Sequence, residues 1–217
     1  MVADRDAAGA ASVVVAIQRA GGTASVFEID VTDPVAVEAM VGFAEKTYGA
    51  LHLAVNNAGI GGPSALTGDY PLNGWQQVID VNLNSVFYCT RYEIAAMLRA
   101  GGGAIVNMAS ILGSVGFSNS AAYVSAKHGV LGLTKAAALE YAAKGIRVTA
   151  VGPGFIDTPL LSNNLDEATL QQIAGLHPVG RLGRSEEVAA LTCFLLSDQA
   201  SFITGSYHLV DGGYVAQ

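Results

Sequence analysis

Short apolar runs alternate with longer amphipathic segments along the whole chain. A run of about four to eight apolar residues that ends at a turn is typical of a buried strand, and the runs here end at Gly, Asn, Asp or Pro. Strands that alternate with helices through short connections favour an open parallel sheet covered by helices on both faces. The predicted strands comprise residues 23–29, 51–55, 104–110, 146–154 and 206–213.

Capping signals bound the helices between these strands. Gly21-Gly22 is a C-cap signal for the segment before it, and Asp33-Pro34 supplies an N-cap followed by an N1 proline. We therefore predict helices over residues 6–20, 33–48, 73–99, 120–144 and 185–196. The fold class is α/β, a doubly wound parallel sheet in one domain over residues 1–217.

Composition narrows the class of protein. Hydrophobic residues make up 51% of the 217 residues and charged residues 13%, which is typical of a core-rich globular protein. The net charge of −7 does not favour nucleic acid as a partner, because nucleic-acid binding requires a basic surface. No apolar run is long enough to span a membrane. Cys89 and Cys193 have no paired spacing, so we expect reduced thiols and a cytoplasmic protein. The four histidines are scattered, so no metal site is predicted.

Chemistry in such folds gathers where the strands end, because ligands bind outside their carboxyl ends. The segments that follow predicted strands are Asp30-Val31, "NNAG" at 56–59, Ser110 onward and "GPGFIDT" at 152–158. Tyr123 and Lys127 are four residues apart in a predicted helix and share one face. An ammonium near a phenol favours the phenolate and lowers its pKa. Taken alone, this spacing is more often a surface pair.

Two further polar residues change that interpretation. Ser110 closes the strand that precedes Tyr123, so its hydroxyl reaches the same edge of the sheet. Asn82 lies in an apolar helical stretch, where an amide needs a partner or a bound water. On its own, Asn82 is equally well explained as a helix-surface amide, and "NNAG" as an ordinary turn.

These motifs, in this order, resemble the short-chain dehydrogenase/reductase family. The resemblance rests on "NNAG", Asn82, Ser110, "YVSAK" at 123–127, "VGPGFIDTP" and the closing "FITGSYHLVDGG". It runs from the first residue to the last and implies a Rossmann-like fold. One match departs from the family's usual Asn-Pro-Gly, because this chain has Gly152-Pro153-Gly154. We expect a small local effect.

The resemblance implies a role for each catalytic position. Tyr123 would be the general acid/base, and Ser110 would hydrogen-bond the substrate oxygen. Lys127 would lower the Tyr123 pKa and hold the nicotinamide ribose, while Asn82 would hold a water in a proton relay to Lys127. The implied reaction interconverts a secondary alcohol and a ketone with a nicotinamide cofactor.

The resemblance also implies which residues hold that cofactor. The adenine would contact Asp30 and Val31, the adenosine side Asn57, Ala58 and Gly59, and the nicotinamide Tyr123, Lys127, Pro153, Gly154, Ile156 and Thr158. Residues 155–184 match the family's variable substrate lid. In that lid Arg181 and Arg184 are as well explained as surface or interface residues as they are as substrate ligands.

The opening stretch "VADRD" resembles the end of the family's second strand. An acidic residue there, Asp4, accepts hydrogen bonds from the adenosine ribose and repels a 2′-phosphate, which favours NAD over NADP. Arg5 beside it weakens that preference, since arginine can hold such a phosphate. Asp4 is otherwise an ordinary terminal charge.

The glycine-rich turn of the family has no counterpart near the start of the sequence. We therefore expect an N-terminally incomplete fold without the first strand, that turn and the first helix, and a sheet with a gap. Residues 1–22 should be displaced or poorly ordered, and cofactor binding weak or absent. Three explanations remain open. The recorded sequence starts late, the chain is a truncation that repacks or borrows a strand, or it is a degenerate relative.

Association of subunits is the expected partner interaction besides the small alcohol or ketone. The predicted helices 73–99 and 120–144 carry apolar residues on more than one face, which requires burial on two sides. The resemblance implies a four-helix interface and a homodimer or homotetramer; a fully internal helix is the alternative. A non-catalytic oligomeric scaffold or degenerate relative of the same fold is the alternative function.

Overall fold

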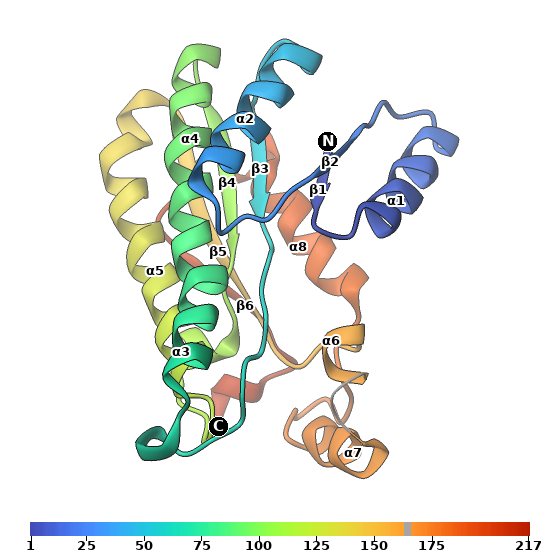
Figure 1. The fold of residues 1–217 in the computed structure, drawn as a ribbon, viewed down its shortest axis with the longest axis vertical. Helices are drawn as coiled ribbons and strands as arrows, with labels where there is room; N and C mark the ends of the chain where they lie inside the picture. The colour runs from blue at the N-terminus through green and yellow to red at the C-terminus, as the bar shows by residue number, and fades with distance from the viewer. Residues whose placement is uncertain (163–165) are drawn as a thin grey trace.

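The structure is a computed structural model that describes residues 1–162 and 166–217. Two parallel sheets stand side by side (Figure 1), one with the order β1-β2 and one with the order β3-β4-β5-β6. The strands are β1 Val2–Asp4, β2 Val26–Glu28, β3 Leu53–Asn56, β4 Gly103–Met108, β5 Ile146–Pro153 and β6 Tyr207–Val210. Each predicted strand is present, although several are shorter than expected.

The helices follow the predicted alternation with the strands. They are α1 Ala7–Arg19, α2 Pro34–Tyr48, α3 Leu72–Ile79, α4 Ser85–Ala100, α5 Ala121–Tyr141, α6 Pro159–Ser162, α7 Glu167–Gly175 and α8 Ser185–Leu196. Side chains of Asp6 and Asp33 accept hydrogen bonds from backbone N–H groups in the first turns of α1 and α2. This confirms the capping signal at Asp33, and Asp6 is a cap that the sequence analysis did not identify.

The core has two layers on opposite faces of the four-stranded sheet. Ile105 of β4 packs with Met97 of α4 and Ala137 of α5, whereas the next residue, Val106, packs with Leu195 of α8. Successive residues of a strand point to opposite faces, so this alternation places α4 and α5 on one side and α8 on the other. The doubly wound arrangement is thereby confirmed.

The predicted helix over residues 73–99 is interrupted. It consists of α3 and α4 joined by a π-helical turn at Asp80–Asn84. A π turn has one residue more than an α turn and often occurs at functional sites. Asn82, inside this turn, is fully buried.

The gap in the sheet is present between β1 and β3, which belong to separate sheets in the described part of the chain. β3 is an edge strand, and its Leu53 and Val55 are 53% and 42% exposed. The expectation of poor order in residues 1–22 is wrong, because β1 pairs in register with β2 and α1 is a regular helix. Here the Asp6 cap and the Gly21 turn specify the structure locally.

Candidate active site

Ser110, Tyr123 and Lys127 meet at the carboxyl end of β4. Ser110 follows this strand, and its Oγ accepts a hydrogen bond from the Leu112 N–H at 3.2 Å, which starts the 3₁₀ turn Ile111–Gly113. Tyr123 lies in the first turn of α5, and the Ser110 side chain lies close enough to its hydroxyl to influence the Tyr123 pKa. Lys127, one turn further on, is 3% exposed. The structure brings together three of the four residues predicted to be catalytic.

Burial controls the proton affinity of the tyrosine. It raises the pKa of Tyr123, and the hydrogen bond from Ser110 opposes this effect. The lowering of this pKa by Lys127 stays a prediction. Nζ lies 5.6 Å from the Tyr123 ring centroid and donates to the Met108 carbonyl at 2.7 Å.

Lys127 is a buried cation without a carboxylate partner in the described residues. Burial lowers its pKa to about 8, because removal from water destabilises the charged form. Its position under Tyr123 leaves the ammonium directed at the end of β4 and the loop after β3. A Cβ on Gly59 would lie 3.8 Å from Nζ, so that loop passes close to the lysine.

Asn82 clamps the loop that follows β3. Its Oδ1 accepts from the Ile60 N–H at 2.8 Å, and its Nδ2 donates to the Ile60 carbonyl at 2.7 Å. The oxygen and the nitrogen of the Asn82 amide thus both bind the backbone of Ile60. The π turn that carries Asn82 thereby fixes the loop after β3 against α4. The predicted water relay from Asn82 to Lys127 stays a prediction.

The predicted cofactor residues fall into two groups. Asn57, Ala58 and Gly59 are exposed at the end of β3. Pro153 ends β5, and Gly154 N–H donates to the Val210 carbonyl at 2.9 Å, which aligns this loop with β6. Beyond it, Ile156 forms a β-bridge with Gly183, and the Thr158 hydroxyl donates to the Ile156 carbonyl at 3.3 Å. These residues share the edge that carries Ser110.

The second group belongs to the two-stranded sheet. Asp4 is the last residue of β1, and its carboxylate accepts from the Asp6 N–H at 2.9 Å. Asp30 accepts from the N–H and hydroxyl of Thr32, and these bonds lower its pKa. Val31 packs partly buried against the α2–α4 cluster. The structure thus places these three residues at the carboxyl edge of β1 and β2, on the other sheet from Ser110 and Tyr123.

A buried polar network below the site was not predicted. Asn56 Nδ2 donates to Glu93 Oε2 and to Asn107 Oδ1, both at 3.0 Å, and Asn107 Nδ2 donates to Thr134 Oγ1 at 3.0 Å. Burial raises the pKa of Glu93 to about 7. The signal was available, since Glu93 is a charged residue among apolar positions of a helix, the same pattern that pointed to Asn82.

His177 is a second residue that the sequence interpretation missed. It is 3% exposed and accepts a hydrogen bond from the Phe155 N–H through Nε2 at 3.2 Å. Since Nε2 accepts, the ring proton lies on Nδ1, which donates to the Ile173 carbonyl at 3.1 Å. The histidine thus ties α7 of the lid to the loop after β5. In the sequence His177 stands apart from the other histidines and from the motifs, so no pattern pointed to it.

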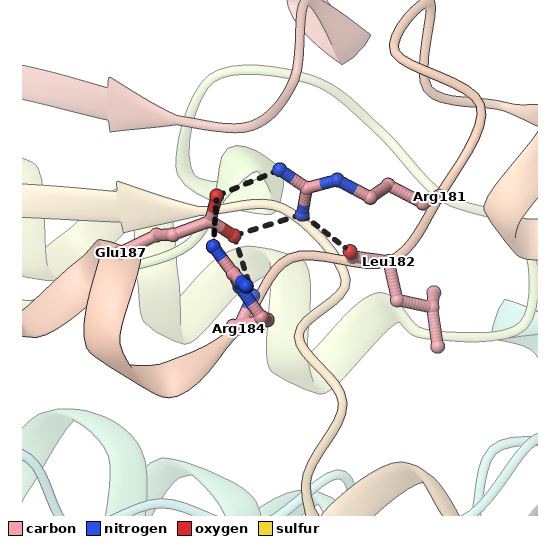
Figure 2. Close-up of polar contacts among 4 residues, drawn as sticks. All are labelled: Arg181, Leu182, Arg184 and Glu187. Atoms are coloured by element: carbon pink, nitrogen blue, oxygen red, sulfur yellow. Dashed lines mark hydrogen bonds and ion pairs between the residues drawn. The ribbon is translucent and has the colours of Figure 1, made fainter.

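The two lid arginines are bound within the protein (Figure 2). Arg181 makes two hydrogen bonds to the Glu187 carboxylate, at 2.9 and 2.7 Å. Arg184 donates its backbone N–H to the same carboxylate at 2.8 Å and pairs with it through Nη2 at 3.7 Å. The bonds with Arg181 are the main cause that lowers the pKa of Glu187 to about 2. Both arginines therefore anchor the end of the lid to α8. The lid prediction for residues 163–165 lies outside the described residues.

Two further features of the described residues bear on the class of site. In the described residues, no cluster of three or more His, Cys, Asp or Glu side chains is arranged to hold a metal ion. No helix among them is both long and apolar enough to cross a membrane.

The fold and the grouped polar residues define a Rossmann-like α/β protein, and comparison with known proteins gives its family. A family model described as enoyl-(acyl carrier protein) reductase matches residues 1–215. With the dehydrogenase relatives below, this match shows that the chain belongs to the short-chain dehydrogenase/reductase family. The chain is an oxidoreductase that acts on a hydroxyl or carbonyl group. These matches do not confirm the expectation of an N-terminally incomplete fold.

Two relatives with assigned activities are similar over almost the whole chain. A cyclohexanol dehydrogenase from Acinetobacter sp. strain SE19 is 53% identical over 217 residues, which cover 100% of this chain and 85% of the relative. A cis-4-hydroxycyclohexanecarboxylate dehydrogenase from Sinomonas cyclohexanicum is 45% identical over 210 residues, covering 97% and 84%.

Solved structures confirm the fold. A candidate short-chain alcohol dehydrogenase from Sinorhizobium meliloti 1021 has a TM-score of 0.93 at 33% identity, and the match covers 99% of this chain and 85% of the other. The protein ElxO, solved with NADP bound, has a TM-score of 0.85 at 38% identity, with 89% and 79% covered.

Proposed function

We propose that this chain interconverts a secondary alcohol on a carbon ring and the corresponding ketone, with NAD as the preferred cofactor. The observation that carries the proposal is the grouping of Ser110 and Tyr123 at the end of β4 with the buried Lys127, whose Nζ lies 5.6 Å from the Tyr123 ring centroid. The ring is suggested by the relatives, whose names include cyclohexanol and a hydroxycyclohexanecarboxylate.

The proposed roles follow from the protonation states. Burial keeps the Tyr123 phenol protonated, so in reduction the phenol can donate its proton to the ketone oxygen. In oxidation the phenol must first lose this proton before it can accept one from the alcohol. The Ser110 hydroxyl hydrogen-bonds the same oxygen and stabilises its developing negative charge. Lys127 supplies positive charge below the phenol at pH values under about 8.

A nicotinamide cofactor fits the residues at this edge. The exposed loop 57–59 runs past Lys127, and at Gly59 a side chain would fill the space beside Asn82, with Cβ 3.2 Å from its Oδ1. Such close backbone approach is what a dinucleotide requires. When bound, the cofactor accepts or supplies the hydride. Asn57, Gly59, Lys127, Pro153, Gly154, Ile156 and Thr158 would hold it.

The cofactor preference rests on Asp4. Its carboxylate lies exposed at the end of β1, where it could accept a ribose hydroxyl and repel a 2′-phosphate. Arg5 beside it opposes this preference, and the related ElxO structure contains NADP. We propose weak binding of either cofactor by the 217-residue chain, since Asp4 lies on the two-stranded sheet, which is not paired with the sheet that carries Ser110.

The second candidate is a non-catalytic oligomeric scaffold of the same fold. Phe87 on α4 and Leu139 on α5 are 46% and 86% exposed, which supports a homodimer or homotetramer through these helices in either case. Calorimetric titration with NAD and NADP separates the candidates. Micromolar binding of NAD favours the enzyme, whereas no heat with either cofactor favours the scaffold for this chain.

Substitution of the general acid/base tests the mechanism. In the presence of NADH and cyclohexanone, Tyr123→Phe should reduce kcat by about a thousandfold, because a positioned acid/base contributes about 10²–10⁴. The matched control is Tyr141→Phe on the same helix, which should retain wild-type kcat. Equal activity of both variants would contradict the assignment of Tyr123.

A further inference from the structure

An aromatic cluster joins the loop after β4, the loop after β5, the lid and the C-terminal segment. Phe155 is its centre: its ring centroid lies 5.9 Å from that of Phe117, 5.8 Å from that of His177 and 5.8 Å from that of Tyr214. His177 and Tyr214 are themselves 5.5 Å apart. Four segments that are distant in the sequence therefore converge on one apolar surface.

This cluster lies at the same edge as the reacting groups. Phe117 is in the loop between Ser110 and the start of α5, and Phe155 is two residues beyond the end of β5. Tyr207 joins the two loops, because its hydroxyl donates to the Ser110 carbonyl at 2.6 Å and its ring fills the space beside Gly152. Phe117 is 40% exposed, so this member of the cluster is accessible from solvent.

The cluster is held rigidly by His177. The Phe155 backbone cannot shift without loss of the bond to Nε2, and a side chain at Gly154 would lie 2.8 Å from the same atom. Nδ1 binds the Ile173 carbonyl, so both nitrogens of the buried ring are used. A rigid wall discriminates between shapes better than a mobile one, because less ordering is required on binding.

The charges near this wall disfavour an anion. The cations of the lid are Arg181 and Arg184, and both are bound to Glu187. The lid also carries three carboxylates, Asp157, Asp166 and Glu167. In the described residues, no arginine or lysine of the lid is left to pair with a substrate carboxylate.

We propose that Phe117 and Phe155, positioned by His177, form the apolar wall of the substrate subsite and select an uncharged ring alcohol or ketone over one with a carboxylate. The inference rests on the proposed function and deepens it. Of the two substrate types named for the relatives, it assigns this chain to the cyclohexanol type.

Direct binding tests this proposal without turnover. Ligand-observed NMR would give the Kd of cyclohexanone and of 4-oxocyclohexanecarboxylate for the wild-type chain. We expect cyclohexanone to bind at least about tenfold more tightly, the equivalent of about 1.4 kcal/mol. Equal or tighter binding of the carboxylate, or no binding of cyclohexanone, would overturn the proposal.

Variants locate the binding to the wall. Phe155→Ala and Phe117→Ala should each raise the Kd of cyclohexanone about tenfold, the usual effect of a lost aromatic contact. Phe202→Ala is the matched control, because Phe202 is fully exposed elsewhere in the chain. Phe117 is largely exposed, so its variant should fold even if Phe155→Ala does not. An unchanged Kd in Phe117→Ala and in any folded Phe155→Ala protein would refute the wall.

The positioning role of His177 has its own readout. His177→Leu should weaken cyclohexanone binding as Phe155→Ala does, whereas His177→Gln, which retains an acceptor and a donor, should largely restore it. Equal binding of cyclohexanone by the wild type, His177→Leu and His177→Gln would refute that role. If the ketone binds as expected but Tyr123→Phe leaves turnover unchanged, the mechanism fails and the subsite stands.

Discussion

The two sheets of this molecule have the same strand–helix alternation but differ in burial. In the four-stranded sheet, β4 buries four of its six residues and β5 six of its eight. In the two-stranded sheet, β1 and β2 bury none of theirs, and α1 buries Ala10 and Val14. Packing therefore holds one region, whereas local capping and turns specify much of the other.

This difference separates two tasks. The reacting groups, Ser110, Tyr123 and Lys127, lie on the region with the large core, where a geometry can be fixed within fractions of an ångström. The residue proposed to choose between NAD and NADP, Asp4, lies on the region with little core. We expect substitutions to affect stability strongly in the first region and weakly in the second.

The largest expected difference is between two identical truncations. Val148→Ala removes a fully buried side chain from β5 and should lower the free energy of unfolding by about 2–3 kcal/mol. Val14→Ala in α1 should cost less than about 1 kcal/mol, because alanine favours the helix and the surroundings can relax. Urea unfolding of both variants measures these changes in the free energy of unfolding. Equal losses in the two variants would contradict the proposed difference between the two regions.

The buried Glu93 should make the stability of the large core depend on pH. The unfolded carboxyl ionises above its ordinary pKa of 4.5, whereas the folded one keeps its proton to about pH 7. The unfolded state therefore binds fewer protons in this window, and stability falls as the pH rises through it. The fall should be about 2 kcal/mol between pH 5 and 7.5.

Glu93→Gln should remove this fall, since its amide oxygen can still accept from Asn56 and it carries no charge. Urea unfolding at several pH values is the measurement, with Glu140→Gln at an exposed position of α5 as the control. A profile in which Glu93→Gln and wild type run parallel would show that Glu93 titrates normally.

The smallest effect concerns the helix caps. Asp6→Ala removes the acceptor for the Ala8 and Gly9 N–H groups and should cost about 1 kcal/mol. Since α1 adds little to the core, hydrogen exchange should quicken about fivefold in α1 while the urea midpoint stays unchanged. Asp33→Ala, at the cap of the well-packed α2, should instead lower the midpoint. A lowered midpoint in Asp6→Ala would mean that both sheets unfold together.

Patterns of local origin were predictable from the sequence. The cap at Asp33, the strands and the spacing of Tyr123 and Lys127 depend on neighbours within a few residues, and all appear in the structure. The direction of the Tyr123 pKa was not predictable, because it depends on burial by distant segments. The same holds for His177, whose partners Phe155 and Ile173 become neighbours only on folding.

The π-helical turn Asp80–Asn84 has a consequence for how this segment tolerates change in length. An α-helix advances about 100° per residue, so the additional residue rotates all of α4 relative to α3. Deletion of one residue here would give an unbroken helix, yet Val86, Ile94 and Met97 would then face away from their core partners. The π turn sets the rotation of α4 relative to α3. The number of residues in the turn is therefore as constrained as the identity of Asn82.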